Sequence, residues 1–451
     1  MRQPYRIESI TLRDIGVFEN TRFDFPPIES IEADDKKAEI HIFTGPNGCG
    51  KSTLLYALAA SFEPMNYSTL IRLRYRSEKS RVDFKFTNMA GRYGISKPDT
   101  SDGIYGDCVA LFDNDSHFFG FEGGWNSDFG EYKKPFSNNE KFTSKKFKFS
   151  AFAYSGHRSP QSQFSISAIQ EISASPFEHA LSFDQTVRPN ILAQWVANNR
   201  TKAALARNDG ENEEAVDYDH ALNKISSFIY EVCGIKAIFQ LKRSPLEVSL
   251  KIDGVNIGFD ALPEGLKSII CWVADLALRL EAIPWSEERD IFSQPIILFL
   301  DEVDIHLHPK WQRRILPAIQ KLLPNAQVFV STHSPFVVGS VEDAWVYRLP
   351  DPQQSICRDP HTPEVIQPAR SSAGKSYQLI LDEVFGVPEQ FDVETEKQLD
   401  EFYRLRQQVM ENQTDDTELK ALANTLTQKG EEVGAIVSME LRQLARLIKK
   451  G

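Results

Sequence analysis

Apolar and polar residues alternate in the first part of the chain, and the pattern then changes its period. Residues 6–12 and 21–25 carry apolar side chains at every second position, which predicts a β-hairpin. Residues 39–43 repeat the alternation and predict a third strand. Residues 53–60 contain no helix breaker and are predicted to form a helix. Strands that alternate with helices are typical of an α/β fold.

Further apolar segments predict more strands of the same core. Residues 296–300 form an uninterrupted apolar run, as expected for a strand in a parallel sheet that is covered on both faces. Residues 151–154, 327–331 and 345–349 predict three other core strands. The first of these leads into a polar loop.

Helices dominate two other parts of the chain. Residues 191–206 and 218–233 predict two helices separated by the acidic loop 208–214, and a hairpin is predicted over residues 236–259. Near the C-terminus two predicted helices carry apolar stripes, formed by Leu399, Phe402, Leu405 and Val409 and by Leu419, Leu422 and Leu426. We expect these stripes to need a partner surface on the core, on another protomer or on another protein.

Composition narrows the class of protein. Charged residues make up 25% and hydrophobic residues 41% of the 451 residues, which is ordinary for a globular protein. The net charge of −12 argues against a chain that coats nucleic acid over its whole surface. The N-terminus lacks the apolar core of a signal peptide, and no apolar run is long enough to span a bilayer. The five scattered cysteines form no C-x-x-C pair. We therefore expect a reduced, cytoplasmic protein that does not insert into a membrane.

A phosphate-binding motif occupies residues 45–52, which have the form G-x-x-x-x-G-K-S. It lies between the predicted strand 39–43 and the predicted helix, and that context distinguishes a P-loop from an ordinary glycine-rich turn. Lys51 is expected to reach the β- and γ-phosphates of ATP, and the Ser52 hydroxyl is expected to bind Mg²⁺. The nucleotide-binding residues are predicted to be Asn47, Gly48, Cys49, Gly50, Lys51, Ser52 and Thr53.

Two other strands end in residues that suit nucleotide hydrolysis. Asp301 and Glu302 follow the apolar run 296–300, and parallel strands place their carboxyl ends where ligands bind. Asp301 is predicted to hold Mg²⁺, and Glu302 to polarise the attacking water. His333 follows another strand and is predicted to contact the γ-phosphate. The alternatives, an acidic turn and a structural histidine, are less consistent with a nearby P-loop.

Three arginines alternate with apolar residues. On a strand, Arg72, Arg74 and Arg76 would share one face. A solvated face that discourages edge pairing explains this pattern. The alternative is a track that contacts the phosphate backbone of DNA.

These motifs resemble the ABC-type ATPase heads of the SMC, Rad50, RecF and OLD proteins. Residues 301–309 are similar to the D-E-x-x-x-H-L-H-P run of the RecF and OLD branch. The resemblance implies that ATP is held between two protomers, with Pro263, Glu264 and Gly265 supplied in trans as the signature loop. That family has a serine where this chain has Pro263. The substitution removes a hydroxyl directed at the γ-phosphate and implies slow hydrolysis.

The resemblance gives the fold class and covers the core, and composition and periodicity divide the rest of the chain. The expected fold is an α/β P-loop NTPase of ABC/SMC-head type with a β-rich lobe, a helical insertion and a C-terminal helical tail. Five parts are expected: a core of residues 1–64, 146–165 and 235–350, the lobe at 65–145, the helical insertion at 166–234, a Pro-rich linker at 351–370 and the tail at 371–451.

The full pattern most resembles the ATPase subunits of Septu-type anti-phage systems. The helical insertion is too short for an SMC or Rad50 coiled coil, and no acidic cluster suggests a Toprim domain. The Septu resemblance implies a homo-oligomer that assembles through its heads, binds ATP and Mg²⁺, and regulates a separate HNH-type nuclease. The alternatives are a RecF/Rad50-like DNA-repair ATPase acting directly on DNA, an ATPase paired with a Toprim nuclease, a transporter's ATPase subunit, and a switch that scarcely hydrolyses ATP.

Overall fold

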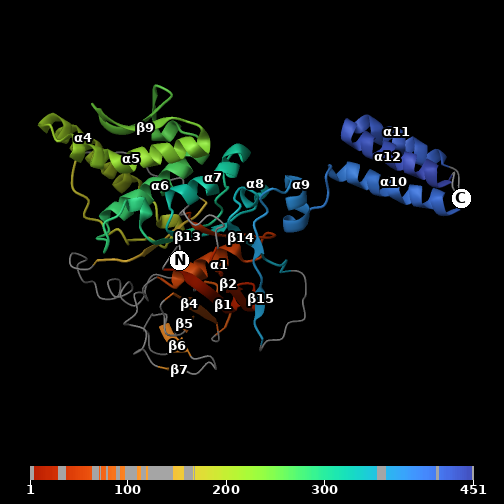
Figure 1. Ribbon diagram of the computed structural model, residues 1–451, viewed down its shortest axis with the longest axis horizontal. Helices are drawn as coiled ribbons and strands as arrows, with labels where there is room; N and C mark the ends of the chain where they lie inside the picture. Colours follow the sequence, from red (N-terminus) through yellow and green to blue (C-terminus); the bar gives the residue numbers. More distant parts are fainter. Residues whose placement is uncertain are drawn as a thin grey trace. The chain divides into compact units, whose positions relative to one another are not determined.

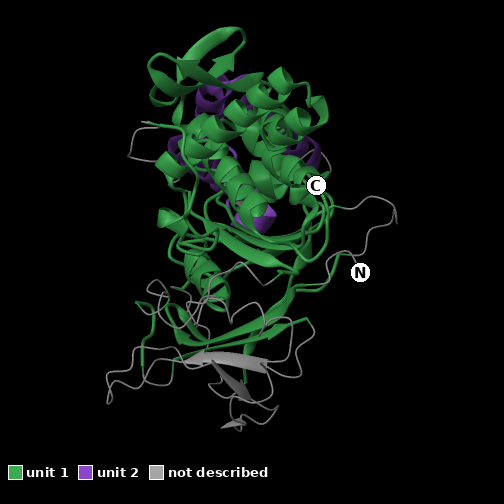
Figure 2. Ribbon diagram, turned by 90° about the vertical axis from the view of Figure 1, so that its left-hand side faces the viewer, with its two compact units in different colours: residues 1–380 green, residues 381–451 purple. Residues whose placement is uncertain are grey.

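The computed structural model describes residues 5–28, 37–62, 71, 73–77, 80–87, 92–96, 109–112, 118–119, 146–156, 166, 168–352, 362–412 and 416–448 (Figure 1). The chain divides into two compact units, Met1–Ile380 and Leu381–Gly451, which are coloured green and purple in Figure 2. Each unit is described by itself.

A six-stranded sheet forms the centre of the first unit. Its order is β16-β14-β3-β13-β12-β8, and all neighbours are parallel except the short β16. Every residue of β3, β8, β12 and β13 is buried, because helices and a second sheet cover the faces. The strands are β3 (Glu39–Thr44), β8 (Ser150–Tyr154), β12 (Ile296–Leu300), β13 (Ala326–Ser331), β14 (Ala344–Arg348) and β16 (Ala369–Arg370). The predicted core strands and the α/β class are confirmed.

Helices lie on both faces of this sheet (Figure 1). Helix α1 (Lys51–Ala60) lies between it and the second sheet, and it contacts β13 and β1. Helices α6 (Glu264–Ala282) and α7 (Pro309–Leu322) cover the opposite face. Shorter helical pieces of the same unit are η4 (Phe259–Ala261), η5 (Ile291–Ser293), α8 (Pro335–Val338) and α9 (Tyr377–Ile380).

The second sheet begins with the predicted hairpin. Strands β1 (Ile7–Ile15) and β2 (Phe18–Asp24) pair antiparallel, and the sheet order is β15-β2-β1-β4-β5-β6-β7. The remaining members are β4 (Arg81–Phe86), β5 (Arg92–Ser96), β6 (Val109–Phe112), β7 (Phe118–Phe119) and β15 (Glu364–Ile366). The described strands of region 65–145, expected to form an inserted lobe, therefore extend the hairpin sheet.

The segment 351–370 was expected to be a linker because it is rich in proline. Instead it supplies a strand to each sheet: β15 pairs parallel with β2, and β16 pairs antiparallel with β14. Proline restricts the preceding residue to extended backbone, which suits short edge strands as well as linkers.

The helical insertion contains both predicted helices. They are α4 (Pro189–Asp209) and α5 (Asn212–Cys233), preceded by the short helix η3 (Phe183–Gln185). Helix α5 begins earlier than predicted, because Glu213 and Glu214 occupy its first turn, where carboxylates interact favourably with the helix dipole. The hairpin that follows has a third strand; its members are β9 (Ala237–Arg243), β10 (Leu246–Ile252) and β11 (Val255–Gly258).

The second unit contains three helices after a π-helical turn (Leu381–Phe385). The helices are α10 (Val393–Asn412), α11 (Thr417–Lys429) and α12 (Glu431–Ile448). Their apolar stripes face one another and form a single core, made of Leu399, Phe402, Val409, Leu419, Ala423, Leu426, Val433, Val437 and Leu444. The expectation that the stripes need an external surface is therefore wrong, since α12 closes the core.

Among the residues that the structure describes, no helix has both the length and the apolar character needed to cross a membrane.

Candidate functional site

The P-loop leaves the carboxyl end of β3 and enters α1 directly. Gly50, just before the helix, has φ of 98°, a left-handed conformation that glycine adopts without strain. A Cβ at this position would lie 2.6 Å from the ring of Phe18. The turn between β1 and β2 therefore packs against the P-loop, and only glycine leaves room for it. Sequence reasoning missed Phe18, because the contact joins segments that are distant in the chain.

Lys51 is buried, and its ammonium is held over the loop. Its Nζ donates to the carbonyl oxygens of Gly45 and Pro46, each at 3.0 Å. The first N–H groups of α1, starting at Lys51, have no acceptor within the helix, and they carry the positive end of its dipole. This donor set fits the phosphates of a nucleotide.

Two acidic residues follow β12, and Ser331 at the end of β13 holds both. The Ser331 hydroxyl donates to Oδ1 of Asp301 and accepts from the backbone N–H of Glu302 at 2.7 Å. The backbone N–H of Asp301 also donates to the carbonyl of Tyr154 at 2.9 Å. Glu302 has φ of 47°, which is uncommon for a residue with a side chain and is often found at functional sites. In the sequence analysis, Ser331 was included only as part of a strand. Its position close to His333 in the chain was the signal that could have identified it.

His333 lies in the same site as these residues. Its partial burial and the Lys51 charge lower the pKa of His333, while Asp304, Glu302 and Asp301 act in the opposite direction. The ring is therefore neutral at pH 7 and can donate or accept a hydrogen bond through either nitrogen, depending on the tautomer.

The predicted nucleotide residues thus converge at one edge of the central sheet. β3, β12 and β13 are adjacent and parallel, so their carboxyl ends deliver the P-loop, the two acids and His333 together. Ser52 and Asp301 are the residues that would hold Mg²⁺, which would neutralise charge on the phosphates. Glu302 would act on water and His333 on the γ-phosphate.

Over residues 73–77 the structure has no strand, so Arg74 and Arg76 do not share a strand face. Residues 73–74 form a turn, and Tyr75 makes a single bridge with Ile15. Arg74 instead lies 4.4 Å above the ring of Tyr56 and donates to the Thr53 hydroxyl at 3.2 Å. Arg76 forms a long ion pair with Asp14 at 3.7 Å.

Arg72 lies outside the described residues, so DNA contact by Arg72, Arg74 or Arg76 stays a prediction. Arg74 itself belongs to the surroundings of the P-loop helix, a role that sequence reasoning did not assign. Burial, followed by the charge of Asp301, raises the pKa of Tyr56 to about 12 beneath this guanidinium.

The predicted signature loop opens α6. Pro263 is the residue before the helix, and its carbonyl accepts from the N–H groups of Leu266 and Lys267, each at 3.0 Å. A Cβ on Gly265 would lie 2.4 Å from the backbone oxygen of His306. Gly265 therefore has a packing function within its own chain, against the loop that follows Glu302. The contact of Pro263, Glu264 and Gly265 with a second protomer remains a prediction.

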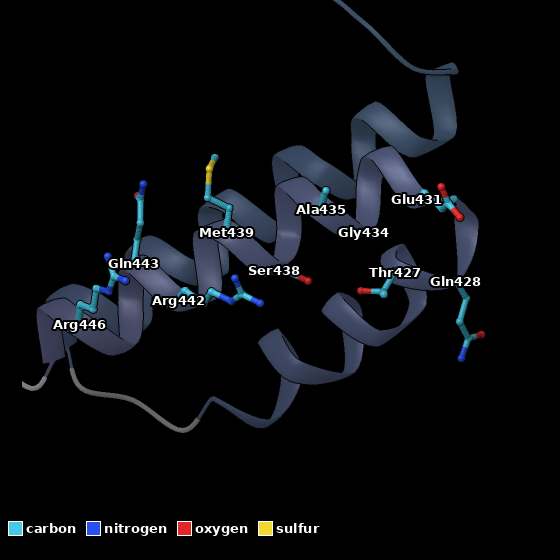
Figure 3. Close-up of a pocket in the computed structure, with 11 residues that line it drawn as sticks. Thr427, Gln428, Glu431, Gly434, Ala435, Ser438, Met439, Arg442, Gln443 and Arg446 are labelled. Carbon is cyan, nitrogen blue, oxygen red and sulfur yellow. The ribbon is translucent and has the colours of Figure 1, made fainter.

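The second unit has a groove of about 870 Å³ (Figure 3). It runs along α12 and the end of α11. Small residues line its middle, among them Gly434, Ala435 and Ser438, and Arg442 and Arg446 lie toward the end of α12. The groove therefore combines small side chains, which leave the helix backbone accessible, with two cationic side chains.

Comparison with known proteins agrees with the nucleotide site. A family model described as "AAA domain, putative AbiEii toxin, Type IV TA system" matches residues 40–339, which include the P-loop, Asp301, Glu302 and His333. The chain belongs to this family. It is therefore classed as a P-loop ATPase, as the motifs predicted.

Several curated relatives share part of the chain. The retron Ec83 probable ATPase of Escherichia coli is 33% identical over 115 residues, which cover 26% of this chain and 21% of the relative. The Septu protein PtuA of Bacillus thuringiensis is 31% identical over 128 residues, 25% of this chain and 32% of the relative. The match confirms the predicted likeness to a Septu protein. Each aligned segment spans less than a third of the relative.

Solved structures give a more distant likeness. The SMC head domain from Thermotoga maritima aligns with a TM-score of 0.39 and 12% identity, covering 77% of this chain and 96% of that chain. The recombination mediator protein RecF aligns with a TM-score of 0.37 and 12% identity, covering 76% of this chain and 96% of that chain.

Proposed function

We propose that this chain is the ATP-binding subunit of an anti-phage defence complex, and that it regulates a separate HNH-type nuclease. The observation that carries the proposal is the convergence of Lys51, Asp301, Glu302 and His333 at one sheet edge. The likeness to a Septu protein and to a retron ATPase supports the defence setting. In this proposal, protomers assemble through their ATPase heads in the cytoplasm.

In this proposal ATP acts mainly as a conformational gate: its binding, more than its hydrolysis, sets the conformation of the complex. The residues expected to hold ATP and Mg²⁺ within one protomer lie together, so binding is supported. Pro263, in contrast, offers neither a hydroxyl nor a backbone N–H toward the nucleotide of a second protomer. Loss of one directed donor typically slows a reaction by roughly 10²–10³-fold while leaving ground-state binding in place. A long-lived ATP state would then hold the nuclease in one conformation.

The test of the gate compares turnover with nuclease output. The native protein is purified together with the product of its neighbouring gene, and both activities are measured across ATP concentrations and with a non-hydrolysable analogue. We expect slow turnover and a nuclease output that the analogue reproduces. Fast hydrolysis, or an output that requires turnover, would contradict the gate. ATPase activity stimulated by DNA ends without any nuclease would favour the DNA-repair alternative.

The second unit is the part that we propose recruits the nuclease. Its apolar stripes are already buried, so recruitment falls to its outer surface, where the groove on α12 has two arginines at one end. An acidic segment of the nuclease suits this groove by charge and by the closeness that small residues allow. Arg442→Glu with Arg446→Glu is expected to release the nuclease while ATP binding remains. Arg404→Glu, on α10 and outside the groove, is the matched control. Retention of the nuclease by the double variant would contradict this assignment.

A further inference from the structure

Gln312, in the first turn of α7, connects two loops at the edge of the nucleotide site. Its Nε2 donates to the carbonyl oxygens of Asp304 at 3.2 Å and Leu307 at 2.9 Å, both in the loop after Glu302. Its Oε1 accepts from the Ser334 hydroxyl at 2.7 Å, directly beside His333. One side chain therefore contacts both the loop after Glu302 and the turn that carries His333, which we call the His333 turn.

The orientation of the Gln312 amide follows from the hydrogen bonds around it. The Ser334 oxygen accepts from the N–H groups of Phe336 at 3.1 Å and Val337 at 3.4 Å. The Ser334 proton is thus left to donate, and only Oε1 can accept it. With the amide flipped, Oε1 would face the carbonyl oxygens of Asp304 and Leu307, with no proton between them.

The loop that Gln312 holds is the one that packs against α6. His306, between Asp304 and Leu307, has φ of 60°, and its carbonyl lies against Gly265. Movement of the His333 turn would therefore reach the start of α6 through two contacts: the Gln312 amide and the His306 carbonyl. Packed elements of this kind tend to shift between discrete arrangements.

We propose that Gln312 is a positioning residue that couples the His333 turn to loop 303–308, so that nucleotide at His333 fixes this loop. The inference rests on the ATPase class of the chain and is independent of the nuclease. Gln312 touches no reacting atom; it acts through Ser334 and through the loop carbonyls.

The experiment uses Gln312→Glu in the full chain. Glutamate keeps an acceptor for Ser334 but replaces the two donated hydrogen bonds with repulsion between oxygens. We expect kcat for ATP hydrolysis to fall about tenfold, as the loss of two neutral hydrogen bonds allows, with the Kd for ATP within about twofold of the parent. In the Glu302→Gln background, ATP is expected to slow amide hydrogen exchange at residues 305–307, and Gln312→Glu is expected to abolish that effect.

Gln320→Ala is the matched control on the same helix. The Gln320 Nε2 also donates to two carbonyls, those of Ala38 at 3.4 Å and Asp343 at 3.2 Å, but at the other end of α7. It is expected to lower the melting temperature without changing kcat or the ATP effect on residues 305–307.

A double-mutant cycle separates coupling from a merely structural role. If Gln312 acts through the His333 turn, Gln312→Glu has little further effect on kcat in a His333→Ala background. Additive losses in the cycle would overturn the proposal. So would ATP-dependent protection of residues 305–307 that persists in Gln312→Glu. If ATP binds with parental affinity, neither result depends on whether a nuclease is regulated.

Discussion

The nucleotide edge of the first unit and the helical bundle of the second are fixed by different kinds of contact. At the nucleotide edge, backbones and rings approach so closely that a Cβ would lie 2.6 Å from Phe18 at Gly50, and 2.4 Å from the His306 oxygen at Gly265. In the bundle, apolar side chains spaced along three helices fill one core. At Gly50 and Gly265 the first region leaves no room for an added carbon atom, whereas the bundle depends on filling its core with apolar side chains.

This difference suits the two roles that we propose, nucleotide binding at the first region and partner recognition at the second. A site that must hold phosphates benefits from rigid backbone donors, because their orientation is fixed before the ligand arrives. The bundle needs only its inner stripes, so the residues of its outer groove are free to suit a partner. If the two regions are independent, a substitution in one leaves the other unchanged.

The largest effect is expected in the bundle. Phe402 is fully buried in the bundle core, so Phe402→Ala is expected to lower the stability of the second unit by about 3–5 kcal/mol. Hydrogen exchange of α10–α12 measures this loss, and ATP binding should be unchanged. Met410→Ala, at a side chain 44% exposed, serves as the control. A parallel loss of ATP affinity in Phe402→Ala would show that the units depend on each other.

At the nucleotide edge, Lys51→Ala is expected to weaken ATP binding by about 3–4 kcal/mol, because it removes the buried charge that we propose contacts the phosphates. Glu302→Gln should bind ATP like the parent, since the proposed role of its carboxylate is to act on the attacking water. Titration with a fluorescent ATP analogue measures both. Equal affinity in the parent and Lys51→Ala would exclude this site.

Gly265→Ala tests the close approach to the His306 carbonyl. The added methyl group must push the loop away, and such overpacking typically costs about 1–3 kcal/mol. The melting temperature and the rate of ATP turnover should both fall, while amide hydrogen exchange in the second unit stays unchanged. Gly258→Ala is the matched control, because its φ is −69° and its Cβ would meet its nearest neighbour at 3.6 Å. Identical behaviour of the two variants would contradict the packing role.

The smallest effect concerns pH. The Lys51 charge is one cause of the lowered pKa of His333, so Lys51→Met is expected to raise that pKa toward the ordinary value. Proton NMR of the His333 ring measures it. The unfolded chain binds this proton more readily than the folded chain. Stability is therefore lost as the pH falls through the lowered pKa, and less so in Lys51→Met. If the pKa of His333 is the same in Lys51→Met as in the parent, the Lys51 charge does not act on His333.

Prediction from the sequence succeeded where the structure of a segment is determined by residues close to it in the chain. Runs such as 296–300 predicted buried strands, and the spacing of Gly45, Gly50 and Lys51 predicted the P-loop. It failed where a distant segment decides. The alternation of arginines near residue 74 imitated a strand, but Tyr75 bridges Ile15, and the chain turns there. The contact of Phe18 with Gly50 and the hydrogen bonds of Gln312 join segments whose pairing no local pattern records.

The bundle shows the same limit in another form. Its apolar stripes were predicted correctly, because helical periodicity is local. Their partner was not, because α12 supplies the rest of the core through residues such as Val437.

The position of β3 between β14 and β13 has a consequence for synthesis on the ribosome. Strand β3 ends at Thr44, but the neighbours that hydrogen-bond to it, β13 and β14, begin at Ala326 and Ala344. Both edges of β3 therefore lack their native partners until the ribosome has synthesised nearly 300 further residues. Such long-range parallel pairing is slow, and unpaired strand edges invite aggregation in the meantime. For the nascent chain, β3 thus stays without its native neighbours until β14 emerges.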